Sequence, residues 1–135
     1  MYIGSWRIEF AYKLPNSVGA RHLALALLDR QRLPRVVELV GWPDSKTNRI
    51  SERRRPYYGE FADYKWQMLA PVTAVERTAF AIKVARQEFE GRLYYPADSN
   101  RFVGDVLGHA RIRLTPLQQH SLGLAPGFGS YHWGT

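Results

Sequence analysis

The first third of the chain carries the apolar patterns of β-strands. Trp6, Ile8, Phe10 and Tyr12 stand at every second position, a period of two that predicts a half-buried strand. Residues 21–28 (RHLALALL) are apolar on both faces and fit either a central strand or a buried helix. The short length of this run, and the turn residues before it, favour a strand.

A second core strand is indicated by residues 36–40 (VVELV), which are rich in β-branched side chains. It is expected to pair with residues 21–28, so that residues 6–42 form an antiparallel meander. Residues 43–70 are the least regular part of the chain. A loop of that length without structure is unusual in a compact domain, and we expect one short strand near residues 64–69.

Helical spacing follows in the second half of the chain. A helix is expected after Pro71, where Thr73 and Glu76 have the spacing of a capping box and Gly91 provides a stop. Its apolar face comprises Val75, Ala79, Ile82, Ala85 and Phe89. A second helix is expected from Asp98 or Ser99, with a polar face of Arg101, Asp105 and His109 and a buried stripe of Phe102, Val103, Val106, Leu107 and Ala110.

The order of these elements predicts the fold class. Strands come first, then two helices, then a tail over residues 115–135 that is rich in Gly, Pro and aromatic residues and has no regular pattern. We therefore expect one α+β domain over residues 1–135, a small antiparallel sheet with two packed helices. The 45% apolar and 23% charged residues are typical of a globular chain.

Net charge and cysteine content narrow the functional classes. Nineteen Lys and Arg against 12 Asp and Glu give +7, which favours anionic partners such as nucleic acid, anionic lipid or an acidic polymer. The absence of cysteine excludes a disulfide scaffold, a thiolate zinc site and a cysteine nucleophile. No apolar run approaches the length of a membrane span.

The N-terminus bears on localisation. No charged segment leads from Met1 into an apolar run, so we expect no secretory signal. The chain is then expected to be cytoplasmic as made. Export, if it occurs, would use a route that reads no N-terminal signal.

The densest basic cluster is Arg53, Arg54 and Arg55, which is followed by Tyr57 and Tyr58. Basic side chains beside aromatic rings can hold a single nucleic-acid strand by charge and stacking. The same cluster fits a solvated loop with a run of charge. No zinc-finger spacing, RNA-binding signature or glycine-rich phosphate loop accompanies it.

The four histidines are candidates for catalysis or metal binding: His22, His109, His120 and His132. No two of them stand four residues apart, which excludes a two-histidine zinc site on one helix. A site assembled in space from histidines distant in sequence stays open, but we expect no metal and no cofactor. His22 stands at the start of an apolar strand, where it could serve as a general base or be a hydrogen-bonded histidine at a strand edge.

Two further residues could complete a catalytic group with His22. Ser99 lies at the expected start of a helix, where free amide groups and the helix dipole stabilise negative charge. Asp98, Ser99 and Asn100 are equally common helix-capping residues. Glu38 lies mid-strand and would share a face with His22 if neighbouring strands pair, or else point into solvent. Together the three match the logic of nucleophilic acyl transfer.

Four short segments carry a family resemblance: residues 21–25 (RHLAL), 38–42 (ELVGW), 98–103 (DSNRFV) and 125–129 (APGFG). They resemble circularly permuted papain-like amidases, a superfamily that includes bacterial cell-wall endopeptidases and relatives of lecithin–retinol acyltransferase. The resemblance implies a papain-like permuted core with Ser99 as nucleophile, His22 as base and Glu38 as the group that orients His22. Asn100 would donate to an oxyanion or cap the helix.

One departure from that family keeps three functions open. Active members usually use cysteine, and this chain has serine at the matching position. The first function is a small amide or ester hydrolase acting on cell wall or another anionic polymer, as a bacterial effector, toxin or phage protein. The second is a non-catalytic relative of that fold, a binding or structural module. The third is an unrelated basic α+β protein that binds nucleic acid or a protein partner.

Overall fold

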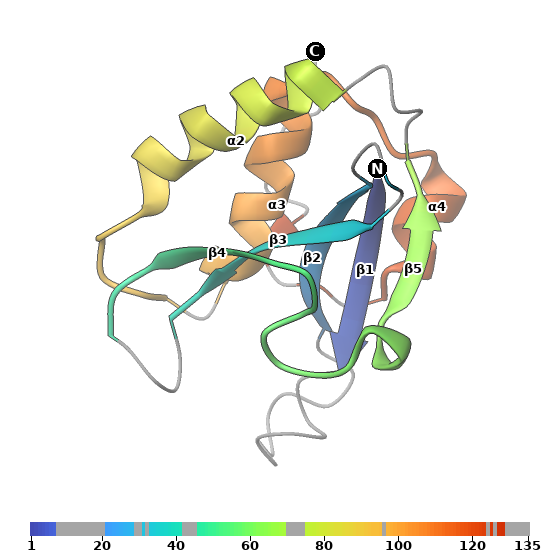
Figure 1. The fold of residues 1–135 in the computed structure, drawn as a ribbon, viewed down its shortest axis with the longest axis horizontal. Coiled ribbons are helices and arrows are strands. Elements are labelled where there is room, and N and C mark those ends of the chain that lie inside the picture. The colour runs from blue at the N-terminus through green and yellow to red at the C-terminus, as the bar shows by residue number, and fades with distance from the viewer. Residues whose placement is uncertain are drawn as a thin grey trace.

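Among the residues that it describes, the computed structural model contains a five-stranded antiparallel sheet and three α-helices (Figure 1). It describes residues 1–7, 21–28, 31, 33–41, 46–69, 75–95, 97–123, 125 and 127–128. The strands are β1 (Tyr2–Arg7), β2 (Arg21–Leu28), β3 (Pro34–Val40), β4 (Arg49–Arg53) and β5 (Lys65–Met68). The helices are α2 (Val75–Phe89), α3 (Asp98–His109) and α4 (Pro116–Ser121), with a 3-10 turn at Phe61–Asp63.

The strand order in the sheet is β4-β3-β2-β1-β5, and every neighbouring pair is antiparallel. The predicted meander and the short strand at residues 65–68 are therefore confirmed, as is the α+β class. The first strand begins at Tyr2, ahead of the predicted start at Trp6, and the expected continuation to Tyr12 lies outside the described residues. None of the described helices is long and apolar enough to cross a membrane.

Strand β4 is absent from the sequence prediction because its residues give no apolar alternation. It is an edge strand with the sequence RISER, and Ile50 is its one buried residue. Because an edge strand of this kind buries only one side chain, its sequence pattern predicts a polar loop. The basic cluster predicted to lie in a loop thus begins inside a strand, at Arg53.

The two long helices agree well with the apolar spacing. All five predicted core residues of α3 are buried, and in α2 the same holds for Ile82, Ala85 and Phe89. Ala79 is exposed, so its assignment to the core was wrong; Thr78 and Ala81 are buried instead, in helical phase with Ile82 and Ala85. Thr73 and the side chain of Val75 lie outside the described residues.

The end of α2 agrees with the sequence pattern, whereas α4 was not predicted from it. Gly91 has a φ of +81°, a left-handed conformation that suits the predicted end of α2. Helix α4 lies within the tail that showed no regular pattern. Thr115 and Gln118 form a capping box there, and Pro116 occupies the first turn.

The two faces of the sheet pack differently. One face carries Leu23, Leu25 and Leu39, which form the main core with apolar residues of α2 and α3. The alternate residues of the same strands point to the other face, where Ala24, Ala26 and Val36 pack with Trp6 and Tyr64. His22 and Glu38 are in phase with this second set.

A pair of phenylalanines tests the packing of the main core. Phe102 is 0% exposed and packs edge-on against Phe89, with ring centroids 6.1 Å apart. We expect Phe102→Ala to lower the free energy of unfolding by about 3–5 kcal/mol, because it removes buried contacts and leaves a cavity. Urea denaturation followed by circular dichroism measures the change. Phe80→Ala, on a side chain that is 66% exposed, is the matched control and should stay within about 0.5 kcal/mol of wild type. Equal losses would contradict this packing.

Candidate active site

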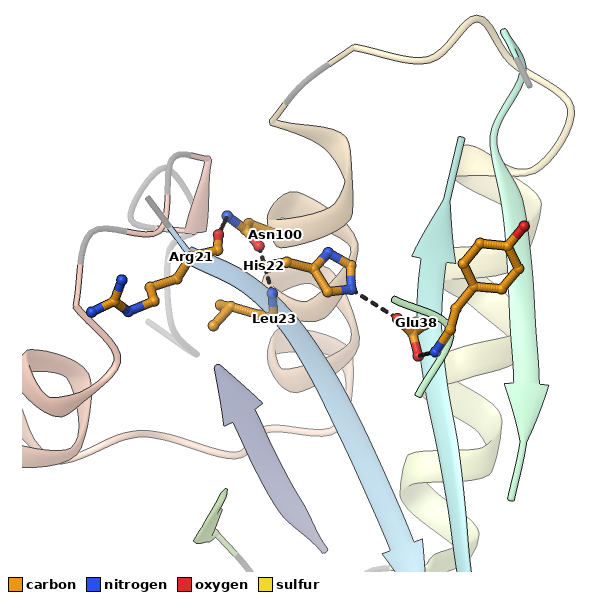
Figure 2. Close-up of polar contacts among 6 residues, drawn as sticks. Arg21, His22, Leu23, Glu38 and Asn100 are labelled. Atoms are coloured by element: carbon orange, nitrogen blue, oxygen red, sulfur yellow. Dashed lines mark hydrogen bonds and ion pairs between the residues drawn. The ribbon is translucent and has the colours of Figure 1, made fainter. Parts of the chain in front are cut away.

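The site is built around an opening between two central strands. The register of β2 with β3 runs from Leu28 opposite Pro34 to Leu25 opposite Val37 and stops there. Beyond that point the two strands diverge, as Figure 2 shows. The diverging ends contain His22 on β2 and Glu38 on β3.

Asn100 takes the place of β3 along the open edge of β2. The backbone N–H of Leu23 donates to Oδ1 of Asn100, and Nδ2 of Asn100 donates to the carbonyl of Arg21, both at 2.9 Å (Figure 2). Residues two apart on an antiparallel strand face the same neighbour, so these are groups that β3 would bind if pairing continued past Leu25. A side-chain amide offers the same donor and acceptor as a peptide group. The first turn of α3 therefore lies in the opening.

Glu38 is a buried carboxylate with a bond to each oxygen. Its side chain is 1% exposed; Oε1 lies 2.9 Å from Nε2 of His22, and Oε2 accepts the backbone N–H of Tyr57 at 2.9 Å. A buried charge is strongly unfavourable unless it is paired and hydrogen-bonded, and these two contacts meet that need. The prediction that Glu38 and His22 share a face is confirmed, and the alternative of a solvated glutamate is excluded.

The contact with Glu38 sets the state of the His22 ring. An ionised carboxylate only accepts hydrogen bonds, so Nε2 carries the hydrogen in the neutral imidazole and Nδ1 presents a lone pair. Within the described part of the chain, no residue hydrogen-bonds Nδ1. His22 is thus held through one nitrogen while the other is available to take a proton.

Aromatic rings enclose His22. Tyr58 meets the imidazole edge-on with ring centroids 4.9 Å apart, and Trp6 and Tyr64 do so at 6.5 and 6.4 Å. Tyr58 also stacks on Trp6 at 5.8 Å. His22 is 3% exposed as a result. These rings shield the His22–Glu38 hydrogen bond from solvent and restrict the imidazole to one orientation.

Ser99 lies in the first turn of α3 and is 3% exposed. Its hydroxyl interacts with the phenol of Tyr94, and the contacts of these described residues include no hydrogen bond from Ser99 to His22. Tyr94 in turn lies against Gly41, just after β3, so closely that a Cβ at Gly41 would overlap the tyrosine ring. Ser99 is therefore the neighbour of Asn100, which binds the open edge of β2, but its own hydroxyl is engaged with Tyr94.

The start of α3 has no side-chain cap, so the capping prediction was wrong. The N-cap residue is Ala97, and Asp98, Ser99 and Asn100 all lie within the helix. The carboxylate of Asp98 accepts the backbone N–H of Tyr95 at 3.1 Å and Nδ2 of Asn48 at 3.0 Å. The side chains of Asp98, Ser99 and Asn100 do not cap the helix. Each of them contacts a residue of a neighbouring strand or loop instead.

The basic cluster is connected to Glu38 through Tyr57. Arg53, Arg54 and Arg55 are exposed. The guanidinium groups of Arg49 and Arg53 lie 5.5 and 5.7 Å from the centre of the Tyr57 ring. Because the amide of Tyr57 also bonds Glu38, the cluster and the candidate catalytic pair are linked through one residue.

Sequence reasoning missed the residues that support the pair. The bracing of β2 by Asn100 and the enclosure of His22 by Trp6, Tyr58 and Tyr64 depend on contacts between distant segments. One usable signal existed: Trp6 and His22 are cross-strand partners in the meander. The pattern does not show where the first strand ends and the second begins, so it does not give the register that pairs Trp6 with His22.

Comparison with protein-family models, curated proteins and solved structures finds no match for this chain.

The environment of Tyr94 gives a prediction for alkaline stability. Burial, and then the negative charge of Asp98, raise the pKa of Tyr94, while the hydrogen bond from Ser99 lowers it. With the pKa higher in the folded state, the unfolded chain loses its phenol proton first. Stability is therefore retained below about pH 10 and declines above it.

Tyr94→Phe should lessen this alkaline decline relative to wild type, as measured by urea unfolding at pH 8 and pH 10.5. Tyr95→Phe, at a neighbouring side chain that is 59% exposed, is the control and should leave the decline unchanged. An identical pH dependence in all three proteins would show that Tyr94 is not buried as described.

Proposed function

We propose that the chain is a small hydrolase of amide or ester bonds, with Ser99 as nucleophile, His22 as general base and Glu38 as the positioning residue for His22. The single observation that carries the proposal is the buried His22–Glu38 pair at 2.9 Å, which leaves Nδ1 of His22 without a partner among the described residues. A histidine with one nitrogen on a carboxylate and the other open has the arrangement of a general base.

The start of α3 supports the choice of nucleophile. An uncapped helix N-terminus offers free amide groups and a partial positive charge, which stabilise an oxyanion formed beside it. Ser99 is in that turn. Its engagement with Tyr94 means that the hydroxyl has to leave the phenol and turn toward His22 before it can react.

The proposed reaction balances without a cofactor. Oγ of Ser99 bonds to the carbonyl carbon of the substrate, its proton passes to Nδ1 of His22, and the carbonyl electrons move to the oxygen. Collapse of this intermediate breaks the bond to the leaving nitrogen or oxygen, which takes the proton from His22. Water then repeats the sequence on the acyl-enzyme, releases the acid and restores Ser99. Glu38 stabilises the imidazolium formed in both halves.

The basic cluster is consistent with an anionic substrate, such as the acidic polymer considered above. Arg53, Arg54 and Arg55 are exposed and stand two to four positions before Tyr57, whose backbone bonds Glu38. Single-strand stacking has less support, because the Tyr57 ring lies under two guanidinium groups and Tyr58 stacks on Trp6. We therefore favour the hydrolase over a nucleic-acid-binding module.

A fluorophosphonate probe tests the proposal, since it reacts with an activated serine and needs no knowledge of the substrate. We expect one adduct, mapped to Ser99 by peptide mass spectrometry and absent from Ser99→Ala. His22→Gln should slow labelling at least about tenfold, because the general base is lost. Ser121→Ala removes a hydroxyl that bonds the Leu117 carbonyl on α4 and should label like wild type. Labelling that spares Ser99, or that is unchanged in His22→Gln, would refute the mechanism and leave the binding-module alternative.

A further inference from the structure

A second group of titratable side chains lies between α2 and α3, which pack against each other at an angle (Figure 1). Glu88 comes from α2, and Asp105 and His109 stand one turn apart on α3. One potential ligand atom from each residue lies within 4.8 Å of the others. None of the three belongs to the candidate active site.

The separations suit a metal ion. Nε2 of His109 and Oε1 of Glu88 lie 3.2 Å apart and share a hydrogen bond, which a bound metal ion would replace. Two ligands of a tetrahedral ion with bonds of about 2.1 Å are roughly 3.4 Å apart, so this pair needs almost no adjustment. Asp105 and His109 are at positions i and i+4, which places both on one helical face toward Glu88.

An independent observation comes from the adjoining cavity. It has a volume of about 560 Å³, and Glu88, Asp105 and Asn48 are among its lining residues. Asn48 is 3% exposed; Nδ2 donates to Asp98, but Oδ1 has no hydrogen-bond partner in the described part of the chain. A buried acceptor without a partner is unfavourable, and Asn48 lies in the wall of this cavity. The cavity is therefore large enough for water beside the cluster, and its wall includes a residue with an unpartnered acceptor.

We propose that Glu88, Asp105 and His109 bind one first-row divalent metal ion, with its remaining positions filled by water facing the cavity. One imidazole and two carboxylates suit Zn²⁺ better than Mg²⁺ or Ca²⁺, which prefer oxygen ligands alone. Arg92 and Arg101 also line the cavity. Arg101 lies 3.6 Å from the carboxylate of Asp98, and the negative charge of that carboxylate offsets part of the repulsion between Arg101 and a bound cation.

Calorimetric titration of the untagged full chain with ZnCl₂ at pH 8 tests the site, because metal ligands have to be deprotonated. We expect wild type to bind Zn²⁺ saturably. In Glu88→Gln and in His109→Gln, one of its binding sites should be lost or its affinity for Zn²⁺ should fall at least tenfold. His120→Gln is the matched control, since His120 is an exposed histidine on α4, outside the cluster. It should bind Zn²⁺ as wild type does. Ten-fold excess Mg²⁺ or Ca²⁺ should not displace the ion.

Saturable binding that is unchanged in Glu88→Gln and His109→Gln, or no binding by wild type, would overturn the proposal. Wild-type protein provides a second measurement in case a variant unfolds. Substoichiometric Co²⁺ should perturb amide NMR signals around residues 88, 105 and 109 before any others. Perturbation centred elsewhere would assign the metal to another part of the chain and refute the site. The hydrolase proposal stands or falls separately, on labelling of Ser99.

Discussion

The burial of the Glu38 carboxylate is the constraint around which the candidate site is arranged. At 1% exposure this charge needs partners on both oxygens, and it has the imidazole of His22 and the amide of Tyr57. These bonds join β3 to β2 on one side and to the segment after β4 on the other. Tyr58, the next residue, then covers His22 and stacks on Trp6. One carboxylate thus positions the imidazole and the aromatic segment that shields it.

At the opening between β2 and β3, the first turn of α3 meets the edge of β2. If the ladder continued past Leu25 and Val37, the edge of β2 would be occupied by β3. The side-chain amide of Asn100 occupies that edge instead, so the Leu23 N–H and the Arg21 carbonyl keep partners where the strands separate. The same turn of α3 carries Ser99. A single Asn therefore holds the first turn of α3, which carries the proposed nucleophile, against the open edge of β2.

Patterns within one element were predictable, and contacts between elements were not. Period-two alternation places Val36 and Glu38 on one face and predicts that Glu38 can meet His22, which the structure confirms. The stripe of α3 was predictable because its buried residues follow one helical phase. Strand β4 was not, since it buries only Ile50, and neither was the Tyr94 partner of Ser99, which depends on the close approach of Tyr94 to Gly41.

The central claim is that Glu38 holds His22 with Nδ1 open as a base, and long-range ¹H–¹⁵N NMR of the imidazole tests it directly. At a pH where His22 is neutral, Nε2 should show the chemical shift of a protonated ring nitrogen and Nδ1 that of an unprotonated one. In Glu38→Gln this tautomer preference should weaken. A wild-type ring protonated at Nδ1, with Nε2 bare toward Glu38, would contradict the claim and remove the general base from the candidate site.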